Sequence, residues 1–361
     1  MEFGVLFTSQ PDTETEKYPY QTLHERVTAE IIEAENLGYD CAWIAEHHFS
    51  TGYGVMPDVF VYAANLAAMT KRIKIGTAVV TLPLSNPIRA VENANFIDIL
   101  SQARFRLGVG SGYRPYEFEG FGLDFEARRE VQEEAVQLML ELFHNRRVRH
   151  TGKHFRSIIE GEYELLPQGL QKPHPPLFMA GATDRSIGYA GRVGFGLLLS
   201  TLTPVETLAQ QVETYRAGLA KAPERTRSNP AFGHVDIARW VYVAETDEAA
   251  KRESEAGLLR HLRHYFGGQT AGYLGETSKG KGALKDDLSY DSLLQATILH
   301  GSPDTVVAQL RRLQEHTGLN SLMLHYPPWY GTQKARKSLA LFAKHVMPQF
   351  RGKEASRTQS A

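Results

Sequence analysis

The amino-acid sequence predicts an α/β protein, a (β/α)8 TIM barrel that forms one domain over residues 1–361. Short apolar runs of strand-forming residues alternate with segments whose apolar residues recur at helical spacing. This alternation is typical of βα units around a parallel sheet. Eight such units can be counted along the chain, which favours a closed barrel over a doubly wound sheet.

The boundaries of several units can be read from the sequence. In the first helix Leu23, Val27 and Ile31 recur at helical spacing, and Gly38 is a favourable residue just past its end. Pro87 is well suited to open the third helix. The expected strands are residues 3–7, 41–45, 73–81, 105–109, 175–180, 196–200, 235–244 and 321–325. The expected helices include residues 20–37, 58–69, 87–100, 126–142, 185–191 and 204–219.

Three segments do not follow this alternation. Residues 145–176 contain many prolines and basic residues and are expected to be irregular. Residues 265–287, after the seventh strand, are rich in Gly and Ala, and a long segment of this kind is usually a functional lid or disordered. We expect it to be a mobile active-site lid, with simple disorder as the alternative. Residues 352–361 are expected to be a disordered tail.

Composition excludes several classes of function. The chain has 40 basic and 41 acidic side chains, so no net charge favours binding to nucleic acid or to an acidic membrane surface. The one cysteine, Cys41, excludes an internal disulfide and lies in an apolar run, where a buried thiol is expected. No apolar stretch approaches the roughly 20 residues that cross a bilayer, and a cytoplasmic protein is expected.

Glu46, His47 and His48 directly follow the second expected strand. A carboxylate and two imidazoles are costly to bury, so they are expected where they are used or solvated, as at an active site on strand ends. A cluster of satisfied polar side chains and a metal site are the alternatives. Neighbouring residues of a strand face opposite ways, so at most one histidine should share a pocket with Glu46. His325 is the only late candidate for a further metal ligand, and we expect no metal site.

Small residues and a possible anion site occur at later strand ends. Residues 108–114 contain alternating glycines that would allow close approach of the backbone, although a plain turn would use the same residues. Residues 179–186 join the fifth strand to a helix, and free backbone N–H groups at a helix start favour an anion. Arg185 in that first turn opposes the helix dipole unless an anion lies there. An ordinary N-cap at Thr183 is the alternative.

Taken in this order, the motifs resemble those of the bacterial luciferase-like flavin monooxygenases. The resemblance covers essentially the whole chain and is densest between residues 43 and 122. It rests on residues 46–49, 77–83, 86–89, 103–113, 180–183, 301–306 and 344–350. The combination is far more specific than any one of these motifs.

The resemblance implies a barrel that binds reduced FMN at the carboxyl ends of its strands and activates dioxygen. His47 would be the catalytic histidine beside the flavin, assisting proton movement around a C4a-peroxide, and Glu46 would lie under the isoalloxazine. A non-prolyl cis peptide bond is expected between Ala78 and Val79. The residues expected to bind the cofactor are Glu46, Ala78, Val79, Asn86, Ser111, Gly112, Tyr113, Gly181, Ala182, Thr183, Arg185 and Ser186.

Some positions depart from the light-emitting luciferases. Gly110 stands where they have a reactive cysteine, and Ser111 where they have an arginine of the phosphate site. Gly181 and Ala182 stand where they have a glutamate and a serine, and Arg185 is expected to supply the missing positive charge. These changes put light emission in doubt but leave flavin monooxygenation as the expectation.

The expected function is therefore a monooxygenase that oxidises a small, apolar or aromatic organic substrate by hydroxylation or Baeyer–Villiger oxidation. No Gly-x-Gly-x-x-Gly motif follows a strand, so reduced FMN is expected from a separate NAD(P)H:flavin reductase. A deazaflavin-dependent hydride-transfer enzyme and a non-catalytic partner subunit are the alternatives. A homodimer is expected from Val59, Tyr62 and Leu66, taken as surface apolar residues. The candidate substrate contacts are Phe7, Phe49, Tyr53, Met56, Tyr113, Tyr116 and Trp329.

Overall fold

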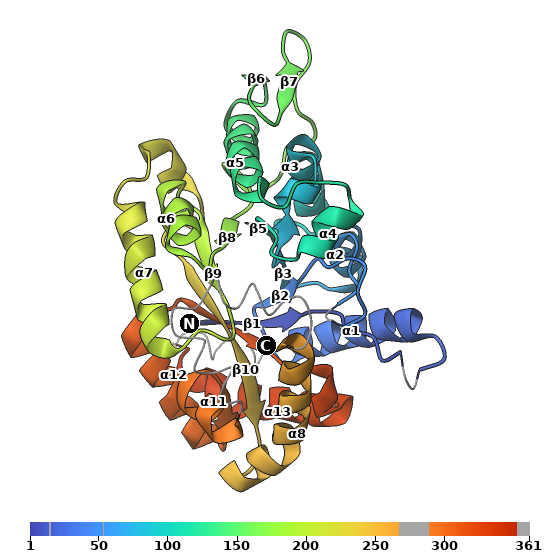
Figure 1. Cartoon of the computed structure of the whole chain (residues 1–361), viewed down its shortest axis with the longest axis vertical. Coiled ribbons are helices and arrows are strands. Elements are labelled where there is room, and N and C mark those ends of the chain that lie inside the picture. The colour runs from blue at the N-terminus through green and yellow to red at the C-terminus, as the bar shows by residue number, and fades with distance from the viewer. Residues whose placement is uncertain (14–15, 53, 267–288, 352–361) are drawn as a thin grey trace.

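Eight parallel strands form a closed ring at the centre of the protein, and helices surround it (Figure 1). The structure is a computed structural model that describes residues 1–13, 16–52, 54–266 and 289–351. The strands of the ring are β1 Glu2–Phe7, β2 Cys41–Ile44, β3 Lys74–Thr77, β5 Phe105–Gly110, β8 Leu177–Ala180, β9 Gly196–Leu199, β10 Val235–Val243 and β12 Ser321–His325.

The order of hydrogen-bonded strands closes on itself. It runs β10, β12, β1, β2, β3, β5, β8 and β9, and β9 pairs with β10 through Val235 opposite Leu197. Every pair in this ring is parallel, so all eight carboxyl ends open on one side of the barrel. The expected (β/α)8 barrel is confirmed.

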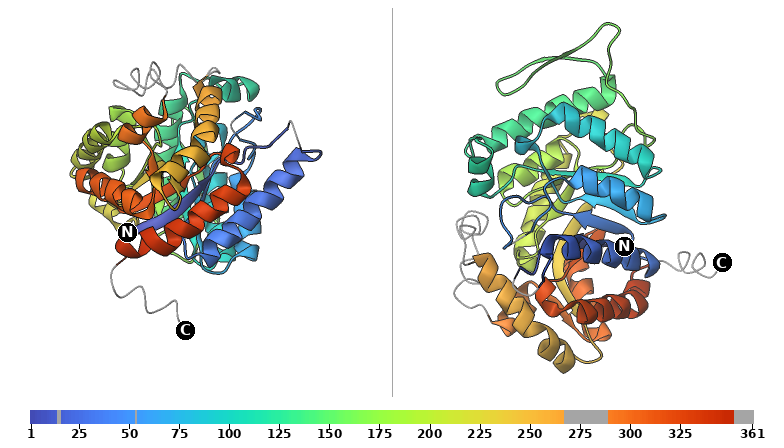
Figure 2. Two further views of the ribbon diagram at one scale, coloured as in Figure 1. Left: turned by 90° about the horizontal axis from the view of Figure 1, so that it is seen from below. Right: turned by 90° about the vertical axis from the view of Figure 1, so that its right-hand side faces the viewer.

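The helices pack around the ring in both views of Figure 2. They are α1 Pro19–Asn36, α2 Val59–Met69, α3 Pro87–Leu100, α4 Pro115–Gly120, α5 Arg128–Asn145, α6 Asp184–Arg192, α7 Val205–Leu219, α8 Asp247–Phe266, α11 Tyr290–Ala296, α12 Pro303–Thr317 and α13 Thr332–Leu341. Several begin at a side-chain cap, which satisfies N–H groups that the helix itself leaves free. The carboxylate of Asp58, for example, accepts from Phe60 N and Val61 N at 2.9 and 3.0 Å.

The barrel interior is filled by side chains of alternate strand residues. Trp43 is fully buried there, and its ring meets that of Phe178 edge-on at 5.3 Å between centroids. Its neighbours Gly4 on β1 and Gly76 on β3 carry no side chain, and a Cβ atom at either position would overlap the indole. The two glycines thus make room for the largest side chain of the interior.

Two of the expected segments differ in the structure. The third expected strand, 73–81, is divided into β3 and the short β4 (Val80–Thr81) by a cis peptide bond between Ala78 and Val79, as the resemblance implied. The segment 145–176, expected to be irregular, contains the antiparallel hairpin of β6 (Val148–Thr151) and β7 (Arg156–Ile159), which projects beyond α5 in Figures 1 and 2. Most of the expected lid, 267–287, and the expected tail, 352–361, lie outside the described residues.

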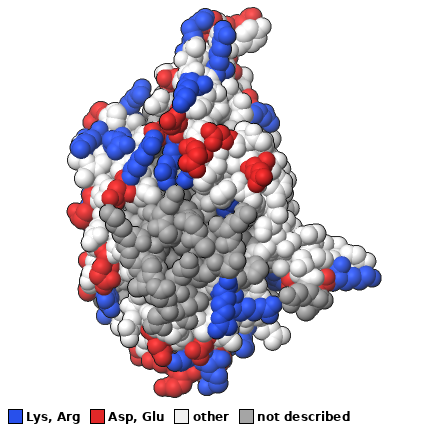
Figure 3. Space-filling view, viewed as in Figure 1, with Lys and Arg blue, Asp and Glu red and all other residues white. Residues whose placement is uncertain are grey.

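The three residues that were expected to form a dimer surface do not lie on the surface of the protein. Val59, Tyr62 and Leu66 are buried against the barrel, whereas Val61 on the same helix is 69% exposed. Lys and Arg are interspersed with Asp and Glu over the face drawn in Figure 3. None of the described helices is long and apolar enough to span a bilayer.

The Gly76–Trp43 contact leads to a stability prediction. Replacing Gly76 with alanine should lower the free energy of unfolding by about 1–3 kcal/mol, because the new methyl group overpacks the barrel interior. The midpoint of urea unfolding measures this change. Gly188→Ala is the matched control, since its Cβ would meet the end of the flexible Arg192 side chain at 3.3 Å and Thr214 Cγ2 at an ordinary 3.8 Å. Equal midpoints for the two variants would contradict the packing argument.

Candidate active site

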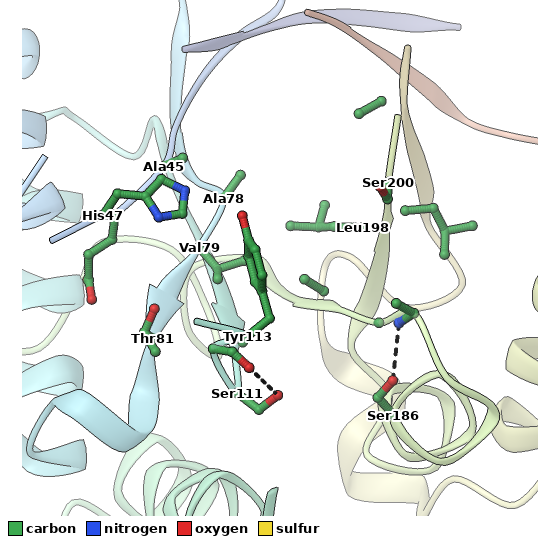
Figure 4. A pocket seen from close by; sticks show the side chains of 18 of the residues that line it. Ala45, His47, Ala78, Val79, Thr81, Ser111, Tyr113, Ser186, Leu198 and Ser200 are labelled. Carbon is green, nitrogen blue, oxygen red and sulfur yellow. Dashed lines mark hydrogen bonds between the residues drawn. The ribbon is translucent and has the colours of Figure 1, made fainter. Parts of the chain in front are cut away.

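A cavity of about 200 Å³ opens at the carboxyl ends of the strands. Residues from every strand of the ring or from the loop that follows it line this cavity. In Figure 4, His47 and Tyr113 lie on one side of it and Leu198 and Ser200, from β9 and its end, on the other. The rings of His47 and Tyr113 meet edge-on, with centroids 6.1 Å apart.

Most of the residues expected to bind the cofactor line this single cavity. They are Glu46, Ala78, Val79, Ser111, Gly112, Tyr113, Gly181, Ala182, Thr183 and Ser186, together with the expected catalytic His47. Asn86 and Arg185 are not among the lining residues. Asn86 instead caps α3, because its side-chain oxygen accepts from Ile88 N and Arg89 N at 2.9 and 3.3 Å.

His47 is held by a carboxylate that the sequence did not indicate. Its Nδ1 lies 3.3 Å from Oε1 of Glu117 on α4, and the same oxygen accepts from the backbone N–H of His48 at 3.0 Å. Burial lowers the pKa of His47. Burial alone would raise the pKa of Glu117, but hydrogen bonds from His47 and His48 bring it below its ordinary value. An ionised Glu117 accepts a hydrogen bond from Nδ1–H, so the tautomer that carries its proton on Nδ1 is favoured.

Glu46 forms a second buried pair, with His48. The two side chains are 3.3 Å apart between Oε1 and Nε2, and burial raises the pKa of Glu46 against the opposing effect of His48. As expected, only one of the two neighbouring histidines, His47, lines the cavity together with Glu46, although β2 itself ends at Ile44, before these residues. Each histidine therefore pairs with a different carboxylate: His48 with Glu46, and His47 with Glu117.

A backbone cradle lies at the ends of β5 and β8. A Cβ atom at Gly110 would lie 2.6 Å from Val79, and Gly112 has a positive φ of 73° that strongly favours glycine. At α6 the ordinary N-cap is confirmed, because Thr183 and Ser186 form a reciprocal capping box. Ser186 Oγ accepts from Ala182 N at 3.2 Å. These capping residues also line the cavity.

The positive charge at this cradle comes from a helix that the sequence argument did not single out. Arg128 and Arg129, in the first turn of α5, line the cavity. Arg128 is only 6% exposed and donates from its guanidinium to Phe125 O at 2.8 Å. Arg185, which was expected here, turns outward and pairs with Glu133 at 2.9 Å. A cation in the first turn of a helix opposes the helix dipole unless an anion lies nearby, and this was the reason for predicting Arg185 as a phosphate ligand. The same reasoning applies to Arg128 and Arg129 and could have predicted them from the sequence.

A buried arginine shapes the wall formed after β9. Arg239 on β10 is 1% exposed, and burial lowers its pKa to about 9. Its guanidinium donates to the carbonyl oxygens of Ser200, Thr201 and Thr203 at 3.1, 3.2 and 2.7 Å. Ser200 and Thr201 line the cavity, so these bonds fix the backbone of one wall.

The expected aromatic substrate contacts are mostly elsewhere. Tyr113 lines the cavity, whereas Phe7 and Met56 are buried in the core and Phe49 is 64% exposed. Tyr53 lies outside the described residues. Among the residues that the structure describes, no group of three His, Cys, Asp or Glu side chains could hold a metal ion.

Residues 1–320 match the protein family described as luciferase-like monooxygenase. The chain belongs to this family. Limonene 1,2-monooxygenase from Rhodococcus erythropolis is 28% identical over 332 residues, which cover 90% of this chain and 81% of that protein. The matches to the first two curated relatives cover only 48% and 58% of the lengths of those proteins.

Solved structures share the fold of this luciferase-like chain. The oxygenating constituent of 3,6-diketocamphane monooxygenase from Pseudomonas putida, a type II Baeyer–Villiger monooxygenase in complex with FMN, superposes with a TM-score of 0.79. It is 21% identical and covers 97% of this chain, which in turn covers 98% of it. An F420-dependent secondary alcohol dehydrogenase superposes with a TM-score of 0.72 at 16% identity, covering 97% and 99% of the two chains.

The His47–Glu117 pair of this luciferase-like barrel leads to a titration prediction. Replacing Glu117 with glutamine removes a negative charge beside the imidazole, so the pKa of His47 should fall further, by about 1 unit or more. NMR of the ring nitrogens of ¹⁵N-labelled histidine measures both this pKa and the tautomer. Glu119→Gln, on the exposed side of the same helix, is the control and should leave both unchanged. A higher pKa of His47 in Glu117→Gln would show that the carboxylate does not stabilise the imidazolium.

Proposed function

We propose that this protein is a monooxygenase that uses reduced FMN, supplied by a separate NAD(P)H:flavin reductase, and dioxygen to oxidise a small organic substrate. The observation that carries the proposal is the continuity of one cavity. It joins the buried His47–Glu117 pair to the backbone cradle and the arginines of α5. Family membership supports the class of reaction.

The shape and charge of the cavity fit FMN. Ala45, Ala78 and Leu198 give one part of the cavity an apolar lining that suits a flat ring, and the polar end near Ser186 and Arg129 suits a phosphate. We assign the phosphate to the residues that line that end, which are Ser111, Gly181, Ala182, Thr183, Ser186, Arg128 and Arg129. When bound, reduced FMN would supply the two-electron chemistry that activates dioxygen.

His47 is suited to move a proton at Nε2. Glu117 holds the Nδ1 proton, and burial keeps the ring neutral near pH 7, so Nε2 can accept a proton and return it. Glu46, whose pKa is raised by burial, lines the same cavity and is a second group that can carry a proton. Ala45, Leu198 and Met323 give part of the cavity an apolar lining, which disfavours water beside the reacting groups.

A deazaflavin-dependent enzyme is the second candidate. The fold is shared with an F420-dependent secondary alcohol dehydrogenase, and a deazaflavin would use the same strand ends. Its reaction is a hydride transfer that needs no dioxygen. Anaerobic reduction of a carbonyl compound by reduced F420, without activity towards reduced FMN in air, would favour this candidate. A flavin-binding subunit without catalysis would bind FMN but leave its oxidation rate unchanged.

The proposal predicts a specific effect on flavin oxidation. Photoreduced FMN mixed with air-saturated buffer should be oxidised more slowly, and in more than one phase, when the protein is present, because the walls of the cavity shield the bound ring. Stopped-flow absorbance measures this. Oxidation at the same rate with and without protein would contradict the proposal.

His47→Gln tests the assigned proton transfer. It should lower product formation by about 10²–10⁴-fold, the usual contribution of a general acid–base residue, while FMN still binds. His316→Gln, an exposed histidine on α12, is the matched control and should behave as the unaltered protein. Full activity in His47→Gln would remove the role assigned to His47.

A further inference from the structure

The turn that follows β9 forms one wall of the cavity and is held from behind by a buried arginine. Ser200 and Thr201 line the cavity on this wall, and Figure 4 shows Ser200 on the side opposite His47. Arg239 does not line the cavity but lies in a separate small space against α11 and α12. From there its guanidinium donates to the carbonyl oxygens of Ser200, Thr201 and Thr203.

Arg239 carries a charge that no carboxylate neutralises. It is 1% exposed, and it takes part in no ion pair within the described part of the chain. Burial lowers its pKa to about 9, so the guanidinium is still protonated near pH 7. A buried charge is costly unless polar groups compensate it, and the carbonyl oxygens of the turn do so here. A positive charge therefore lies directly behind this wall.

The bonds to Arg239 turn hydrogen-bond donors of the same peptides to the other side. In a trans peptide the N–H points opposite to the C=O, so the N–H of Thr201 points away from the guanidinium and towards the cavity. This N–H has no partner among the described residues. The hydroxyl of the partly exposed Thr201 has none there either, and it is not enclosed by protein. The hydroxyl of Ser200 accepts from Leu202 N at a long 3.5 Å, which leaves its own proton to donate.

We propose that the turn of Ser200 and Thr201, held by the buried Arg239, binds a carbonyl oxygen of the molecule that occupies the cavity. The donors are the N–H and hydroxyl of Thr201 and the hydroxyl of Ser200, and the charge behind them stabilises the partial negative charge of that oxygen. Arg239 is a positioning residue, since it acts through the turn. A ketone substrate and the ring carbonyls of a flavin offer the same chemistry. The inference rests on the proposed function, which takes this cavity as the ligand site.

A matched pair of probes measures recognition of the oxygen in a substrate. Cyclohexanone and methylenecyclohexane have nearly the same shape, but only the ketone has an acceptor oxygen. NMR titrations of the full chain, with and without oxidised FMN, give both affinities. With ¹³C at the carbonyl, the same titration reports the downfield shift that follows when the oxygen accepts hydrogen bonds. Fluorescence quenching by the protein gives the affinities of FMN and riboflavin, which measure recognition of the ring oxygens.

Thr201→Val removes one hydroxyl and keeps the shape of the side chain. It should weaken binding of the oxygen-bearing ligand by about three- to tenfold, as expected for one hydrogen bond. Loss of ketone affinity and of its ¹³C shift, with methylenecyclohexane unchanged, assigns the oxygen to the substrate. Equal losses for FMN and riboflavin, with the ketone unchanged, assign it to the flavin ring. Thr214→Val is the control, because the Thr214 hydroxyl bonds Gln210 O on α7, outside the cavity.

Arg239 variants test the positioning role. Arg239→Met should weaken the same ligand as Thr201→Val, although it removes no group from the cavity, and Arg239→Lys, which keeps the charge, should restore part of the affinity. Unchanged affinities for the ketone and for both flavins in Thr201→Val and Arg239→Met would overturn the proposal. Failure of the unaltered protein to bind FMN would instead overturn the proposed function, and the comparison of ketone and alkene would still be measured.

Discussion

Closure of the strand ring is the constraint on which the site depends. The pairing of β9 with β10 joins the two ends of the sheet, and with all strands parallel it brings eight carboxyl ends around one opening. His47 and Glu117 are 70 residues apart in sequence and Thr8 and His325 are 317 apart, yet both pairs meet at this opening. The interior packing beneath, with Trp43 between two glycines, keeps the ring filled, so the cavity forms only above it.

The cavity has two chemically different ends. One end combines backbone N–H groups, small residues and two arginines, which is suited to an anion. The other side contains histidines that burial keeps neutral, with His325 near a pKa of about 4. A neutral imidazole in a buried position can exchange or donate a proton without the resting cost of a buried charge. The arrangement therefore separates recognition of charge from proton transfer.

The sequence was sufficient to predict the barrel and most of the named residues that line the candidate cavity, because apolar periodicity locates strand ends and parallel strands bring those ends together. The sequence was not sufficient where the direction of a side chain determines whether that residue lines the cavity. Arg185 and Arg129 both stand in first helical turns, but only the structure shows that Arg185 turns towards Glu133 and Arg129 towards the cavity. Glu117 could not be assigned to His47, since their contact depends on where α4 lies. Likewise, Val59 and Val61 look alike in sequence, but the first is buried and the second exposed.

The central claim is that the β5–β8 end of the cavity binds the phosphate of a flavin. Comparing the affinities of FMN and riboflavin by fluorescence quenching tests it directly, because the two differ only in that group. We expect FMN to bind at least about tenfold more tightly, as charge-assisted hydrogen bonds contribute about 1.5–3 kcal/mol. Arg129→Met should reduce the ratio of the FMN and riboflavin affinities, whereas Arg185→Met should leave this ratio unchanged, since Arg185 pairs with Glu133 instead. Equal affinities for FMN and riboflavin in the unaltered protein would contradict the account.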